Sequence, residues 1–154
     1  MNKKLNSKKT IGRKDKADFP RMRLYDIDVK IDTGAYTSAI NCQNIKVIEK
    51  DGTKYVSFNL LDPTHPDYSE KKYRMLLYSK KKIKNSFGKS EERCIIKTTI
   101  KLFEKNFEIE LSLSDRSNMD NPVLIGRKLL KKQFVVDVSK SDLSYKQKVK
   151  RRKK

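Results

Sequence analysis

Apolar and polar residues alternate along much of the chain, which is the pattern of β-strands that bury one face. In residues 25–31, the apolar side chains of Ile27, Val29 and Ile31 alternate with charged ones. The clearest alternation runs through residues 107–114, where Phe, Ile and Leu side chains alternate with Glu and Ser. Both segments are predicted to be half-buried strands.

Turn residues divide the rest of the chain into further strand-sized segments. These are runs rich in apolar and β-branched residues, and they cover residues 45–48, 55–60, 73–78, 94–103, 122–126 and 134–138. Asp51-Gly52, between the first two, favours a tight hairpin because both residues tolerate positive φ. The basic, glycine-containing residues 79–93 are expected to form a long, exposed hairpin. Residues 127–132 give the only convincing helical turn.

Short strands joined by turn residues, with one short helix near the C-terminus, are typical of a small sheet that closes on itself. A length of 154 residues suits one domain with a real hydrophobic core. The predicted fold is therefore all-β, a single domain built as a small β-barrel or closed sandwich.

Charge is distributed unevenly along the chain. There are 38 Lys and Arg against 19 Asp and Glu, a formal net charge of +19. Residues 1–16 hold seven basic residues and one acidic residue, and residues 140–154 hold eight and one. Such charged runs are usually disordered and solvated. We therefore predict a disordered basic arm at residues 1–9, a folded domain at 10–139 and a disordered basic tail at 140–154.

The composition disfavours several functional classes. No apolar run approaches the ~18 residues needed to span a bilayer, and the Lys-rich start does not lead into a signal peptide. A cytoplasmic protein with no membrane contact is expected. Cys42 and Cys94 belong to no metal-binding or redox motif and are expected to be reduced thiols. The only histidine, His65, lies in a proline-flanked turn, which argues against a zinc site or a histidine-dependent nucleophile.

The candidate chemistry centres on Asp32, which follows the strand predicted at residues 25–31 and opens the motif Asp32-Thr33-Gly34-Ala35. A carboxylate at this point leaves the sheet on a tight turn, where Gly34 would permit backbone geometry that strains other residues. On its own, Asp-Thr-Gly is also common in ordinary hydrogen-bonded turns. A second segment is needed to assign it a function.

That second segment is residues 123–130, roughly 90 residues downstream, where Val-Leu-Ile leads through Gly126-Arg127 into a short helix. Together the two segments resemble the retropepsin-like aspartic proteases, in which a strand ending in Asp-Thr-Gly-Ala is paired with a late apolar-apolar-Gly-Arg-x-Leu-Leu element. The closer similarity is to the bacterial RimB-like family, often labelled ATP-dependent zinc protease. The similar stretches are residues 11–13, 30–40 and 113–116, and the resemblance covers about residues 10–139.

The resemblance implies a closed acid-protease β-barrel with Asp32 as its catalytic residue. Because the chain has one Asp-Thr-Gly, a complete site would need a homodimer in which two copies of Asp32 face each other. Two carboxylates that share a site hold one proton between them, so one acts as base and the other as acid. The implied activity is that of an aspartic-type endopeptidase on peptide or protein substrates, with no metal and no cofactor.

The resemblance also implies supporting roles for other residues. They form an active-site scaffold of Thr33, Gly34, Ala35, Gly126 and Arg127, and a substrate-binding flap of Asn85, Ser86, Phe87 and Gly88. Retroviral members have an acid, paired with the arginine, at the position that Tyr36 occupies here. Asp115 and Asp137 are therefore both candidate partners of Arg127.

A second hypothesis comes from a different functional class. The chain would be a non-catalytic basic adaptor that binds ribosomal RNA, a ribosomal protein or an ATP-grasp glutamate ligase. RimB-like proteins are associated with a ligase that adds glutamates to a ribosomal small-subunit protein, and an acidic tail would complement basic arms. Binding to phosphate would fall steeply with salt.

Overall fold

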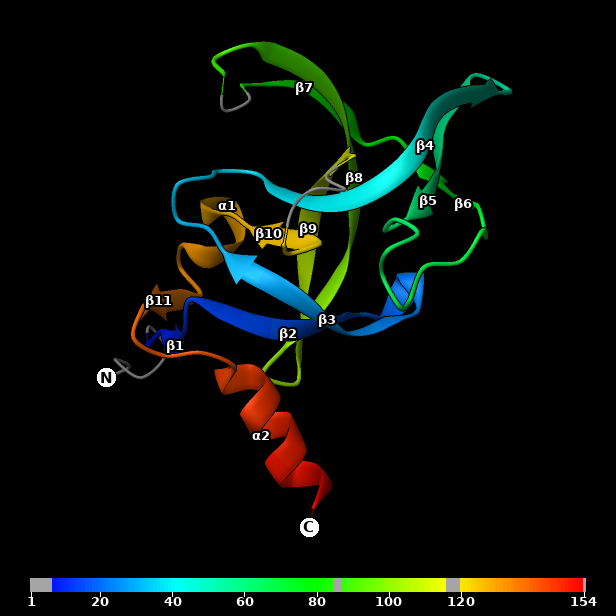
Figure 1. Ribbon diagram of the computed structural model, residues 1–154. Coiled ribbons are helices and arrows are strands. Elements are labelled where there is room, and N and C mark those ends of the chain that lie inside the picture. The colour runs from blue at the N-terminus through cyan, green and yellow to red at the C-terminus, as the bar shows by residue number, and fades with distance from the viewer. Residues whose placement is uncertain (1–6, 85–86, 116–119, 154) are drawn as a thin grey trace.

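The computed structural model describes residues 7–84, 87–115 and 120–153, and these form a mostly β, single-domain protein (Figure 1). The strands are β1 (Lys9–Ile11), β2 (Lys14–Phe19), β3 (Leu24–Ile31), β4 (Ser38–Lys50), β5 (Thr53–Leu60), β6 (Tyr73–Leu76), β7 (Ser79–Lys84), β8 (Ser90–Leu102), β9 (Lys105–Ser114), β10 (Val123–Ile125) and β11 (Phe134–Val136). The helices are α1 (Arg127–Leu130) and α2 (Leu143–Arg152), with a 3-10 turn at Pro20–Met22.

Most of the strands belong to one sheet. Its order is β10-β3-β2-β8-β9-β4-β5-β6, with β7 paired to β8, and β10 pairs with β4 as well as with β3. The pairings therefore lead from β10 through β3, β2, β8, β9 and β4 back to β10. Strands β1 and β11 form a separate parallel pair.

The alternating segments form strands as predicted. In β3, Ile27, Val29 and Ile31 are all buried, as the alternation requires. Strands β4 and β5 pair up to Lys50 and Thr53, and Asp51 and Gly52 between them have φ of 53° and 80°. The predicted hairpin turn is therefore confirmed.

The prediction of a disordered tail at residues 140–154 is wrong for helix α2. The helix begins where the buried carboxylate of Asp15, in β2, accepts hydrogen bonds from the N–H groups of Ser144 (2.9 Å) and Tyr145 (3.0 Å). These bonds supply acceptors for N–H groups that a helix cannot satisfy internally. Of the predicted arm at residues 1–9, residues 1–6 lie outside the described residues and Lys9 begins β1.

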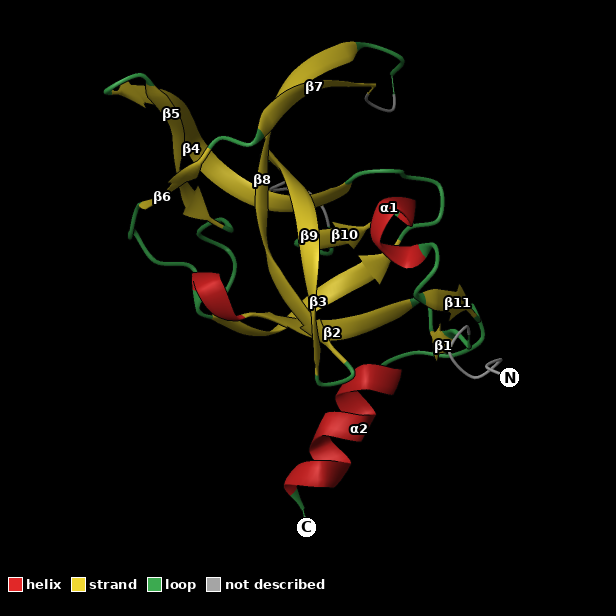
Figure 2. Ribbon diagram, turned by 180° about the vertical axis from the view of Figure 1, so that it is seen from behind, coloured by secondary structure: helices red, strands yellow, loops and turns green. Residues whose placement is uncertain are grey.

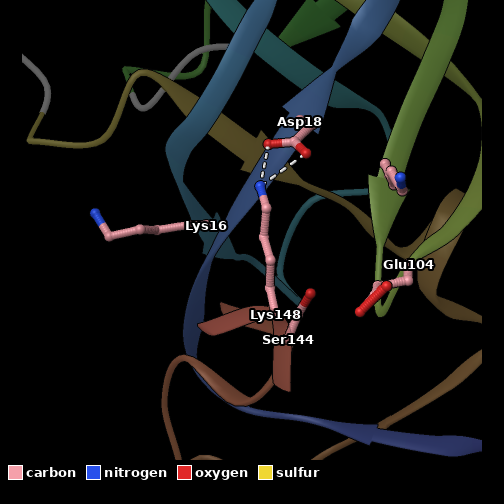
Figure 3. A pocket seen from close by; sticks show the side chains of 6 residues that line it. Lys16, Asp18, Glu104, Ser144 and Lys148 are labelled. Carbon is pink, nitrogen blue, oxygen red and sulfur yellow. Dashed lines mark hydrogen bonds and ion pairs between the residues drawn. The ribbon is translucent and has the colours of Figure 1, made fainter. Parts of the chain in front are cut away.

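Lys148 fixes the middle of α2 to the sheet. Its Nζ lies 2.9 Å from Asp18 Oδ2 and 2.5 Å from Asp26 Oδ1, and Figure 3 shows the side chain reaching from the helix to Asp18. Helix α2 and the tip of the β7–β8 hairpin lie at opposite ends of the molecule (Figures 1 and 2). Neither helix in the described part of the chain has the length and apolar character of a membrane span.

Candidate active site

Asp32 directly follows β3 and opens the loop that contains the rest of its motif. Its N–H donates to the carbonyl of Ile125 in β10 (2.9 Å), and its own carbonyl accepts from Ala35 N–H (3.2 Å). Its carboxylate Oδ1 accepts from Gly34 N–H at 3.0 Å. Within the described residues this half-buried carboxylate has no ion pair, so main-chain groups alone orient it.

Strand β10 and helix α1 support the loop from the other motif. The N–H groups of Arg127 and Lys128 donate to the carbonyls of Ala35 (2.8 Å) and Tyr36 (3.0 Å). The structure therefore brings together the two segments that the sequence places roughly 90 residues apart.

The glycine that close packing requires is Gly126. A Cβ added there would lie 2.5 Å from the carbonyl oxygen of Tyr36, a contact that real side chains do not make. The Gly126 N–H donates to the hydroxyl of Ser38 at 3.0 Å. The expectation that Gly34 provides a special backbone conformation is wrong, because its φ is not positive.

Arg127 uses a main-chain acceptor in this loop. Its guanidinium donates to the carbonyl of Thr33 at 2.9 Å and lies 5.8 Å from the ring centroid of Tyr36. Of the two carboxylates considered from the sequence, Asp137 accepts from the N–H and hydroxyl of Ser139 (3.0 and 2.6 Å), and Asp115 follows the end of β9. Arg127 thus fastens the loop through Thr33 and Tyr36.

The hairpin predicted at residues 79–93 is confirmed. Strand β7 pairs with β8 from Ser79 opposite Ile95 to Lys84 opposite Ser90. Of the four flap residues, Asn85 and Ser86 lie outside the described residues, Phe87 is 87% exposed and Gly88 has a φ of 81°. The hairpin therefore presents Phe87 to solvent.

Glu110 in β9 links this hairpin to helix α1, and the sequence analysis did not find it. Its carboxylate lies 2.8 Å from Lys128 Nζ and 3.7 Å from Lys81 Nζ in β7, and its side chain is only 12% exposed. Burial raises the pKa of Glu110, but the bond to Lys128 and the charges of Lys128, Lys81 and Lys97 outweigh it and lower the pKa overall. No signal marks Glu110 in the sequence, because it occupies an ordinary polar position of an alternating strand.

The cysteines and the histidine make none of the contacts described above for this site. Neither Cys42 nor Cys94 forms a disulfide, and burial raises the pKa of the Cys42 thiol to about 12. His65 lies in a turn, where its N–H donates to the carbonyl of Asp62 at 2.9 Å. No three His, Cys, Asp or Glu side chains of the described ranges gather as metal ligands.

An Asp-Thr-Gly-Ala loop at the end of a strand, supported by a Gly-Arg element after a second strand, defines a retropepsin-like protein. Comparison with known families agrees with this class. The chain belongs to the RimB-like family, described as "Retropepsin-like aspartic endopeptidase RimB", whose sequence model matches residues 10–147. The match extends beyond the predicted domain end at residue 139 and into helix α2.

Curated relatives and a solved structure add two kinds of similarity. Proteins of Desulfotalea psychrophila and Shewanella pealeana, each named "Probable alpha-L-glutamate ligase", are 35% and 34% identical over 85% and 88% of this chain. The matches cover 28% and 30% of those proteins, so the chain spans less than a third of their length. A Legionella pneumophila protein of unknown function is 26% identical, with a TM-score of 0.73 over 90% of this chain and 99% of that one.

Proposed function

We propose that the protein is an aspartic-type endopeptidase that acts as a homodimer. The observation that carries this proposal is the Asp32 carboxylate, which main-chain bonds orient at a strand end and which no cation neutralises within the described residues. Membership of the RimB-like family supports it. The ring of paired strands around this loop would be the acid-protease barrel.

The proposed mechanism needs the Asp32 carboxylates of two copies. One proton shared between them leaves one group ionised and the other protonated, and the pair titrates as a unit. The ionised group takes a proton from a bound water, which attacks the scissile carbonyl, while the protonated group donates a proton to the carbonyl oxygen. The tetrahedral intermediate collapses as a proton passes to the leaving amine. Thr33, Gly34 and Ala35 would hold the carboxylate in place.

The β7–β8 hairpin would act as the flap. Its Phe87 is exposed at the end of the hairpin, and its base is tied through Lys81 and Glu110 to Lys128 in α1. A hairpin connected in this way to the Gly126-Arg127 element could close over bound peptide and exclude water.

The first experiment replaces Asp32 by Asn and measures peptide-bond cleavage. Wild-type protein incubated with a peptide mixture from denatured proteins should generate new peptide termini, detected by mass spectrometry. D32N should reduce their formation by at least about 100-fold, since it removes a group that must accept and donate protons.

Asp28 provides the matched control for this substitution. It lies on β3, the strand that leads into Asp32, and it pairs with Lys16 at 2.7 Å, with a side chain that is 55% exposed. D28N should retain cleavage, and both variants should keep the wild-type circular dichroism spectrum. Undiminished cleavage by correctly folded D32N would contradict the proposal, and a statine-type inhibitor should block the wild-type protein.

The second candidate function is that of a basic adaptor, and the names of the curated relatives favour it. The relatives named as glutamate ligases contain a region similar to this chain within a much longer protein. The chain would then bind a separate glutamate ligase, or the ribosomal RNA or ribosomal protein associated with it, through its basic terminal segments. Deletion of residues 1–9 and 150–154 should abolish co-sedimentation with ribosomes or co-elution with such a ligase; full retention of both would exclude this function.

A further inference from the structure

A hollow of about 900 Å³ opens between strands β5 and β6 and the middle of β8. Its lining includes no residue of the Asp32 loop, β10 or α1. Strand β6 and helix α1 lie on opposite sides of the molecule (Figure 1). The hollow is therefore separate from the Asp32 loop, although Lys97 and Tyr78 of its lining lie close enough to Glu110 and Lys128 to influence their pKa values.

Two strand edges without partners meet at this hollow. Strand β6 is the last strand in the order of the sheet and, among the strands of the described residues, it pairs only with β5, with Leu76 opposite Tyr55. Strand β8 pairs with β7 as far as Ile95 and with β2 at Lys101. Between Ile95 and Lys101, the edge of β8 that faces away from β9 has no strand partner among the described residues. Lys97, which belongs to this segment, lines the hollow. Unpaired strand edges offer main-chain donors and acceptors to another chain.

The walls of the hollow are largely apolar, and two of their large side chains are exposed. Met75, Leu76 and Leu77 contribute aliphatic side chains, and Tyr73 and Tyr78 contribute aromatic ones. Leu76 is 61% exposed and Tyr78 is 50% exposed. Grouped exposed side chains of this kind mark a surface that binds something else.

The charged side chains of the lining are all positive: Arg21, Lys54, Arg74 and Lys97. Lys97 pairs with Glu108 across β8 and β9 at 3.7 Å, and its Nζ lies 4.2 Å from the ring centroid of Tyr78. The other three are exposed and have no ion pair with any residue of the described ranges. Their field attracts an anionic partner.

We propose that this hollow docks an acidic, extended segment of another protein, which adds as a strand at the edge of β6. Main-chain bonds to β6 would give affinity, and alternate side chains would enter the apolar hollow or meet its cations. The unpaired edge of β6 favours a polypeptide over nucleic acid, because only a polypeptide offers main-chain groups that continue the sheet. A second copy of this chain suits the positive lining less well than an acidic segment does, because its basic residues outnumber its acidic ones by 38 to 19.

The proposal is tested by measuring the binding of a defined peptide. The full-length protein used for this carries D32N, so that it cannot hydrolyse the peptide. The probe is a fluorescein-labelled octapeptide in which Glu alternates with Val or Leu, and the comparison peptide has the same composition with its four Glu in one block. Fluorescence anisotropy should show saturable binding of the alternating peptide, with affinity at least about five-fold higher than for the block peptide, because only alternation presents one apolar face.

Two charge-reversal variants separate local from general electrostatics. K54E/R74E should weaken binding by about ten-fold or more. K146E/K150E changes the net charge equally at two exposed positions of α2 and should change affinity less than about two-fold. Equal losses in the two variants, or equal affinity for the two peptides, would overturn the proposal. The proposal would also be overturned if an oligouridine bound more tightly than the alternating peptide and lost this binding in K54E/R74E. Self-association of the wild-type protein that K54E/R74E abolishes would overturn it as well.

Discussion

At the scale of single residues, Glu110 joins two elements of the candidate site and contributes stability that depends on pH. Its pKa is lowered in the folded protein, so the ionised form is favoured by folding. This stabilisation is fully present above about pH 4.3, the usual pKa of Glu in an unfolded chain. It is lost as the pH falls from there through the lower pKa that Glu110 has in the folded protein.

Replacing Glu110 by Gln should therefore destabilise the protein more at pH 7 than at pH 3. We expect the free energy of unfolding to fall by roughly 1 kcal/mol at pH 7, because the bond between charged groups is lost, and by less at pH 3. Urea unfolding at both pH values measures this. Glu108→Gln is the control, because Glu108 is 72% exposed and pairs with Lys97 at 3.7 Å. An equal loss at both pH values would contradict the electrostatic explanation.

Gly126→Ala tests the close approach between the two motifs. The new Cβ would lie 2.5 Å from the Tyr36 carbonyl oxygen, so the loop must move, and we expect a loss of about 1–3 kcal/mol in the free energy of unfolding. At Gly34 a Cβ would meet only Asp32 Oδ1, at 3.3 Å, and Gly34→Ala should cost clearly less. If the two variants were equally stable, Gly126 would not be the tight point of this site.

At the scale of elements, the sequence predicts what depends on local pattern. The alternation at β3 and β9 and the Asp51-Gly52 turn are sufficient to place those strands and the β4–β5 hairpin. Strand β2 could not be predicted, because its buried Asp15 and Asp18 interrupt the apolar pattern. These two carboxylates are buried because they bind helix α2, a contact between residues about 130 positions apart.

The same reasoning explains the errors at α2 and Glu110. A basic, weakly apolar segment such as residues 143–152 is typical of disorder when considered alone. It forms a helix here because its basic side chains pair with carboxylates on and beside the sheet. Within the candidate site, both motifs could be recognised in the sequence. The roles of Ser38, Glu110 and the Thr33 carbonyl could not, since each depends on a partner from another element.

Lys148 should determine whether α2 stays docked. Burial lowers its pKa, but hydrogen bonds to Asp26 and Asp18 outweigh burial and raise it, so the side chain is charged at neutral pH. Lys148→Met would leave both carboxylates without this partner, and we expect a loss of about 1–3 kcal/mol. Hydrogen exchange of the α2 amides should become faster than in Lys146→Met, whose residue is exposed. Unchanged protection of α2 would mean that the Asp15 contacts suffice.

At the scale of the whole molecule, net charge and the proposed dimer oppose each other. Each copy has a formal charge of +19, and two copies that bring Asp32 to Asp32 must approach against that repulsion. Part of the positive charge of helix α2 is neutralised locally, because Lys148, Arg151 and Arg152 lie against carboxylates of their own chain. The C-terminal segment is therefore less of an obstacle to association than its composition indicates.

Salt should consequently strengthen the dimer and the peptidase activity together. Raising ionic strength from 0.01 M to 0.15 M shortens the screening length from about 30 Å to about 8 Å, which weakens repulsion between like-charged copies. Sedimentation velocity should then show a larger dimer fraction at 0.15 M, with higher cleavage per copy at low protein concentration. Acidic peptide bound in the β6 hollow should respond in the opposite direction, because there salt screens an attraction. Dissociation of the dimer by added salt would show that attractive charge pairs hold the two copies together. Such a dimer would differ from the one that hydrolysis requires, in which the two Asp32 carboxylates face each other.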